Sequence, residues 1–103
     1  MASKEEAARA ASAGADVNRP ISGEDEASQS LADARHWVRV YSSLVALEQQ
    51  LLDIFAGNIP SMPREAQIEA EQTNLPVLLT QVERFRKRLD FWVRRERELS
   101  TQA

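Results

Sequence analysis

The sequence predicts an all-α protein: an antiparallel hairpin of two helices with coiled-coil-like packing, preceded by a disordered arm and completed to a four-helix bundle by dimerisation. All six aromatic residues lie beyond position 36. In that part of the chain apolar residues recur every three or four positions, which is the spacing of one helix face. The turn-rich stretch "GNIPSMP" at 57–63 separates two such periodic segments.

The N-terminal region is poor in apolar side chains. Besides Met1, residues 1–27 hold only Val17 and Ile21 as large apolar residues. A segment with so little surface to bury cannot offset the entropy lost on ordering. We therefore expect a disordered arm over 1–27 and one helical domain over 28–100.

The first helix is expected over about 28–56. Ser22 and Ser30 each have an acidic residue three positions later, the spacing of a capping box, so the helix should begin between them. It should end before Gly57, because Gly57 and Pro60 are typical of a helix end and the turn that follows.

A connector with a short helix over about 63–73 should follow, since proline is favoured at a first helical position. Pro76 lacks a backbone N–H and disfavours helical geometry in the residue before it. We expect a break at 73–76 in preference to a kinked continuous helix. The second long helix should then cover about 75–99.

The second helix carries one apolar stripe at heptad spacing, interrupted by Glu96. Its members are Leu75, Leu78, Val82, Phe85, Leu89, Trp92 and Leu99. A repeat sustained over three heptads is typical of coiled-coil packing, so this stripe should lie against the first helix.

The first helix carries two apolar stripes about 100° apart around its axis. The first apolar stripe is Trp37, Val40, Leu44, Leu47, Leu51 and Ile54. The second apolar stripe is Val38, Tyr41, Val45, Glu48, Leu52 and Phe55. So wide an apolar arc predicts burial against two neighbours. We assign the first stripe to the chain's own second helix and the second stripe to self-association as a C2 dimer, because the short helix offers only Ile68 besides alanines.

The sequence offers little for catalysis or metal binding. His36 is the one histidine, there is no cysteine, and the three glycines are isolated. The acidic cluster of Glu65, Glu69 and Glu71 lacks the Glu-x-x-His partner of a di-iron bundle. We expect no enzymatic activity, no catalytic or metal site and no cofactor.

The C-terminal region is basic, with seven basic and three acidic side chains over 84–103. A basic stripe at helical spacing is the candidate partner-binding surface: Arg84, Arg88, Phe91 and Arg95. We expect a non-enzymatic protein–protein interaction module, acting as a small adaptor, regulator or accessory subunit. The alternative is a nucleic-acid-associated regulator using the basic face of 84–97, although Asp90 and Glu96 interrupt that face.

The expected partner is a second copy of the chain or another helical protein, and nucleic acid is less favoured. No apolar run approaches the roughly 18 residues that span a bilayer. We therefore expect a cytoplasmic protein that does not bind membranes.

Overall fold

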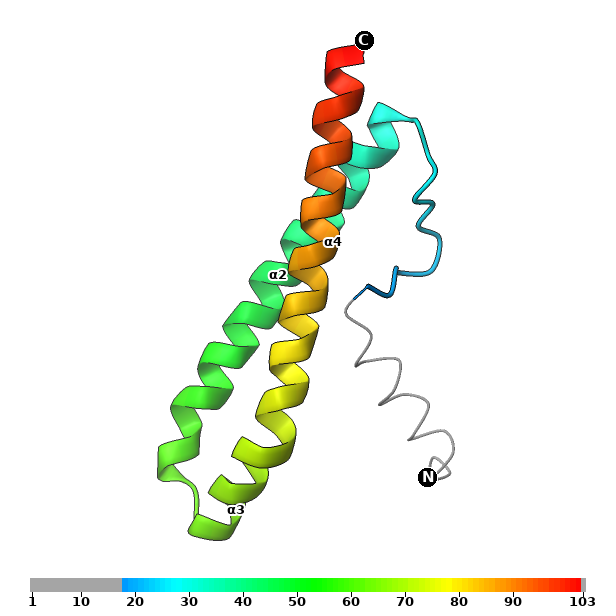
Figure 1. Ribbon diagram of the computed structural model, residues 1–103. Helices are drawn as coiled ribbons and strands as arrows, with labels where there is room; N and C mark the ends of the chain where they lie inside the picture. The colour runs from blue at the N-terminus through cyan, green and yellow to red at the C-terminus, as the bar shows by residue number, and fades with distance from the viewer. Residues whose placement is uncertain (1–17, 103) are drawn as a thin grey trace.

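The computed structural model describes residues 18–102 and confirms the all-α class. Two helices of 28 residues each, α2 (Leu31–Asn58) and α4 (Leu75–Gln102), lie side by side and antiparallel (Figure 1). Between them come a 3₁₀ turn, η1 (Ile59–Ser61), a short helix, α3 (Arg64–Glu69), and a π turn, η2 (Ala70–Asn74). Residues 1–17 of the expected disordered arm lie outside the described residues.

The start of α2 follows from its capping residue. The Ser30 hydroxyl accepts a hydrogen bond from the Asp33 backbone N–H at 3.2 Å, so Ser30 is the cap of the two serines considered. The helix ends at Asn58, two residues later than predicted. Gly57 is tolerated within the last turn, and the 3₁₀ turn that follows buries Ile59.

The predicted break at 73–76 is wrong, because the backbone stays helical from α3 through η2 into α4. Leu75 has φ −61° and ψ −46°, which is helical geometry. The π turn immediately before it is wider than an α turn. That extra width moves the preceding carbonyl groups away from the ring of Pro76, with which they would clash in a regular α-helix.

Aromatic packing forms the centre of the core between α2 and α4. Trp92 and Tyr41 have no solvent-exposed surface. The Trp92 ring stacks on Trp37 with centroids 6.4 Å apart, and the Tyr41 ring lies 6.1 Å from that of Phe85. The stripe predicted for the second helix thus faces the core: Val82, Phe85, Trp92 and Leu99 are buried.

Both stripes of α2 contribute to the contact with α4, and Trp37 and Leu44 of the first stripe pack on the core cluster as predicted. The second stripe, predicted for self-association, lies against α4: Tyr41 is buried, and Val38 and Val45 pack on the same core cluster. The lower half of the first stripe is open instead, with Leu47 49%, Leu51 44% and Ile54 54% exposed. Periodicity alone could not decide which of two faces of α2, 100° apart, packs against α4. The structure shows that the face is fixed by Tyr41, which fits against the aromatic residues of α4.

Within residues 18–102, no helix combines the length and the apolar character needed to cross a lipid bilayer.

Candidate functional site

Residues 18–30, which we call the docked segment, run along one flank of α4 (Figure 1). Disorder was predicted as far as residue 27, and for 18–27 the structure corrects that expectation. Ile21 packs against the core cluster, and Gly23 makes the turn that follows it. At Gly23 φ is +94°, and the Glu24 N–H closes the turn on the Ile21 carbonyl at 3.1 Å. Such a φ favours glycine.

Glu24 is the polar centre of this contact, and its side chain has no exposed surface. The Trp92 indole N–H donates to Glu24 Oε2 at 2.6 Å. The Tyr41 hydroxyl donates to Oε1, and the Arg88 guanidinium donates to Oε2. The Ile21 backbone N–H adds a bond to Oε1 at 3.0 Å. Donors from both long helices therefore converge on one carboxylate.

These bonds control the protonation of the groups involved. Burial favours the neutral form of Glu24, but the hydrogen bonds from Tyr41, Arg88 and Trp92 outweigh burial and hold its pKa below the usual value. Burial, together with the hydrogen bond to Glu24, raises the pKa of Tyr41. The site therefore holds a carboxylate anion against a neutral phenol and a guanidinium cation.

The side chains of the predicted basic stripe lie on the flank of α4 that the docked segment covers. Arg84 and Arg88 are only 4% and 6% exposed. The guanidinium groups of Arg88 and Arg95 lie 4.9 and 5.2 Å from the centre of the Phe91 ring. Cation–π contacts of this kind hold arginine side chains in place over an aromatic ring.

The arginines of the basic stripe bind mainly the backbone of the docked segment. Arg84 Nε donates to the carbonyl oxygen of Arg19 at 2.9 Å. Arg95 Nη1 donates to the carbonyl oxygens of Glu26 and Ser28 at 3.0 and 2.9 Å. Arg88, besides binding Glu24, lies 3.2 Å from the Glu26 carboxylate. The surface predicted to bind a partner is occupied here by the chain's own residues.

Sequence reasoning missed Glu24 and the polar atoms of Tyr41 and Trp92. It placed Glu24 in the disordered arm and treated Trp92 and Tyr41 only as members of apolar stripes. One local signal was available: Ile21 is an isolated large apolar residue followed by Gly23 in a polar stretch, which is consistent with an anchored turn.

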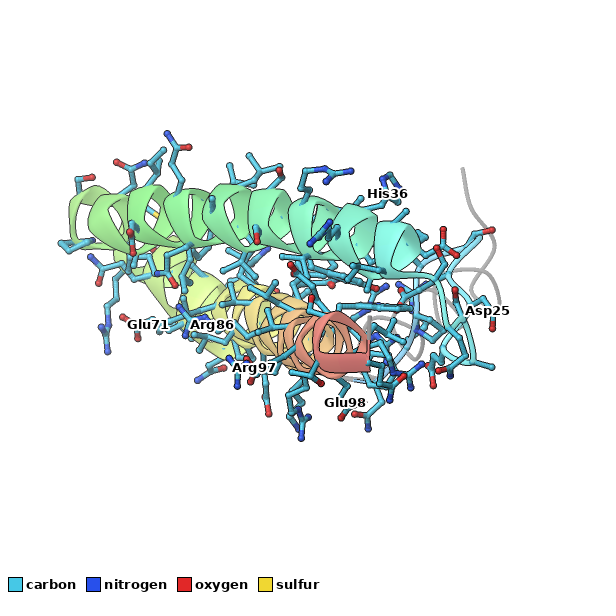
Figure 2. The ribbon with its side chains drawn as sticks, turned by 90° about the horizontal axis from the view of Figure 1, so that it is seen from above. Asp25, His36, Glu71, Arg86, Arg97 and Glu98 are labelled. Atoms are coloured by element: carbon cyan, nitrogen blue, oxygen red, sulfur yellow. The ribbon has the colours of Figure 1, made fainter. Side chains whose placement is uncertain are left out.

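The other residues considered for catalysis or metal binding do not come together in a site within residues 18–102. His36 is exposed and points away from α4, with its ring 5.2 Å from that of Trp37 (Figure 2). Across residues 18–102 no three His, Asp or Glu side chains gather where they could hold a metal ion. The acidic residues of the connector, including Glu71, are exposed.

Comparison with protein families, with curated proteins and with solved structures finds no match for this chain.

Proposed function

We propose that this chain is a non-enzymatic interaction module of the cytoplasm, a small adaptor, regulator or accessory subunit, which self-associates through the first apolar stripe of α2. The observation that carries the proposal is the exposure of Leu47, Leu51 and Ile54, three large aliphatic side chains on one helix face. A contiguous apolar surface of this kind marks an interaction site in a folded protein.

A second copy of the chain suits this surface because the stripe is complementary to itself in antiparallel orientation. A twofold axis passing between residues 45 and 46 sets Leu44 opposite Leu47 of the other copy. It also sets Val40 opposite Leu51 of the other copy. Each layer is then apolar on both sides, as in an antiparallel coiled coil. Two hairpins joined in this way form a four-helix bundle.

The centre of α2 also suits a close helix–helix approach. Residues 40–47 include no charged side chain. Ser43 and Ala46 are small and exposed, and they lie near the proposed twofold axis. No like charges would therefore meet at the point where the two helices come closest.

Light scattering at micromolar concentration tests the proposal. The wild-type chain should give at least twice the 11.6 kDa of one copy. Leu47→Glu combined with Leu51→Glu should give a monomer with unchanged helicity. Leu79→Glu is the matched control, because Leu79 is a leucine of α4 that is 50% exposed. It lies two helical turns before Arg86 and on the same side of α4, where Arg86 bonds Gln49. That side is away from the first apolar stripe of α2. A wild-type monomer at all concentrations would contradict self-association.

The nucleic-acid alternative has less support, because its central arginines are engaged. Arg84, Arg88 and Arg95 bind the docked segment, and Lys87 pairs with Glu83 at 3.3 Å. Binding of a labelled DNA or RNA duplex that weakens steeply with salt would restore this alternative.

A further inference from the structure

We infer that the surface on which the docked segment lies is a binding site for an extended acidic peptide of a partner protein, and that the docked segment is its tethered occupant. We call this surface the groove, and it is made by Tyr41, Arg84, Arg88, Trp92 and Arg95. This groove is separate from Leu47, Leu51 and Ile54, the exposed part of the first apolar stripe of α2. The inference holds whether or not the chain self-associates.

The groove is built to receive a carboxylate. The hydroxyl of Tyr41, the indole N–H of Trp92 and the guanidinium of Arg88 come from two different helices and meet at Glu24. Two-helix packing alone has no use for these three donors, and burying them without an acceptor is costly. Their convergence is therefore explained by the carboxylate that they bind.

Two further arginines recognise an extended chain through its backbone, without reading its side chains. Arg84 and Arg95 donate to backbone carbonyl groups of the docked segment, at distances of 2.9–3.0 Å. Every peptide carries such carbonyl groups, so these bonds set the path of the ligand and not its identity. The groove should therefore accept peptides other than the resident one.

Within residues 20–30, three side chains of the docked segment supply the selectivity. Ile21 is its apolar anchor, Glu24 fills the carboxylate position, and Glu26 makes a second ion pair with Arg88. A ligand should thus carry an aliphatic residue three positions before a glutamate and a second acid two positions after it.

The resident segment does not use every donor in the groove. Arg88 Nε is buried and has no hydrogen-bond acceptor within residues 18–102. A peptide that offers one more acceptor at this position would bind better than the segment it replaces. The short tether through Ser28–Ser30 compensates, because it gives the segment an effective concentration on the order of millimolar. A partner peptide must compete with that concentration.

A full-length chain with its own segment disabled tests the site directly. The receptor carries Ile21→Ser and Glu24→Ala, and the probe is a fluorescein-labelled peptide of residues 18–30. We expect saturable binding to this receptor and at least tenfold weaker binding to wild type, whose groove is occupied. Glu24→Gln in the peptide should reduce affinity at least tenfold. Asp25→Asn is the matched control and should change little, because Asp25 is exposed and its side-chain hydrogen bond, from the Ala27 N–H at 3.0 Å, can also be accepted by an asparagine oxygen (Figure 2).

A measurement on the wild-type chain covers the case in which the receptor variant does not fold. Unlabelled peptide at millimolar concentration is added to ¹⁵N-labelled protein. The amide resonances of Ile21, Glu24 and Ser28, which are hydrogen-bonded in the docked segment, should move to random-coil positions. Absence of displacement in wild type, together with no binding to any folded receptor variant, would overturn the inference. A chain that instead exchanges segments between two copies would show that the occupant is a second copy and not a partner peptide.

Discussion

The two ends of the hairpin are built differently. At the end where α2 begins and α4 finishes, the core is aromatic, and Tyr41 and Trp92 are fully buried. At the connector end several large aliphatic side chains are open to solvent, with Ile54 and Val77 54% and 57% exposed. Phe55 and Val77 there line a hollow of about 340 Å³.

The two ends differ because a third element, the docked segment, covers the helices at one end only. Two packed helices bury one face of each and leave the neighbouring faces in solvent. At the aromatic end the docked segment covers such a face on α4 and closes the core. At the connector end no described residue does so for Leu47 or Leu51. A second hairpin, as proposed, would supply that cover.

The largest expected effect is the loss of an aromatic anchor. Trp92→Ala should lower the free energy of unfolding by about 3–5 kcal/mol, because it leaves a large cavity in the core of the aromatic end. Leu51→Ala, on the exposed stripe toward the connector end, is the comparison. It should lower the free energy of unfolding of the monomer by less than about 1 kcal/mol. Urea denaturation followed by circular dichroism measures both. Equal losses would show that the two halves are not different.

Removing the charge of Glu24 should have the next largest effect. Glu24→Gln removes the buried ion-pair partner of Arg88 and leaves it only the half-exposed Glu26, which should cost about 2–4 kcal/mol. Hydrogen exchange should accelerate at the Ile21 amide, which donates to Glu24. Asp25→Asn should leave exchange unchanged. Retained protection of Ile21 in the Glu24 variant would argue that the segment is held by other contacts.

Acid should release the docked segment before it unfolds the helices. The pKa of Glu24 is lower in the folded chain than in the unfolded one, because hydrogen bonds stabilise its anion. Its contribution to stability is therefore present above the ordinary carboxyl pKa and is lost as pH falls through the lowered value. NMR of the Trp92 indole N–H follows the transition. The Glu24→Gln variant should lack this transition; an identical pH profile would assign it to another group.

Exposed ion pairs should have the smallest effect. Arg35 Nε lies 3.6 Å from Glu96 Oε1 at the aromatic end, and both side chains are partly exposed. Arg35→Ala should change stability by only about 0–1 kcal/mol. Thermal melts at low and high salt measure it. A larger loss would mean that this surface pair helps to close the aromatic half.

The sequence was sufficient for features that depend on local patterns. The hairpin follows from the apolar periodicity, and the start of α2 follows from the capping position of Ser30. The face that α2 turns to α4 did not follow, because two adjacent stripes satisfied the same spacing. The continuity across Pro76 did not follow either, since a π turn leaves no clear mark in composition.

For the candidate site, the sequence identified residues but not their contacts, and binding of a partner there stays a prediction. The spacing of Arg84, Arg88, Phe91 and Arg95 identified a surface that does make specific contacts. Its occupant was not predicted, because Glu24 is buried mainly through contacts with residues distant along the chain: Tyr41 is 17 positions away, and Arg88 and Trp92 are 64 and 68 positions away. A hydropathy argument treats such a residue as exposed, and only three-dimensional packing reveals the donors around it.

The elongated outline of the chain has a hydrodynamic consequence. Its principal extents are 57 × 32 × 17 Å, so a single copy experiences more friction than a sphere of equal mass and elutes early from a sizing column. Lateral pairing through α2 would thicken the particle without lengthening it, and the frictional ratio would fall as the mass doubled. Pairing end to end would raise that ratio. Sedimentation velocity therefore reports the geometry of association as well as the number of copies.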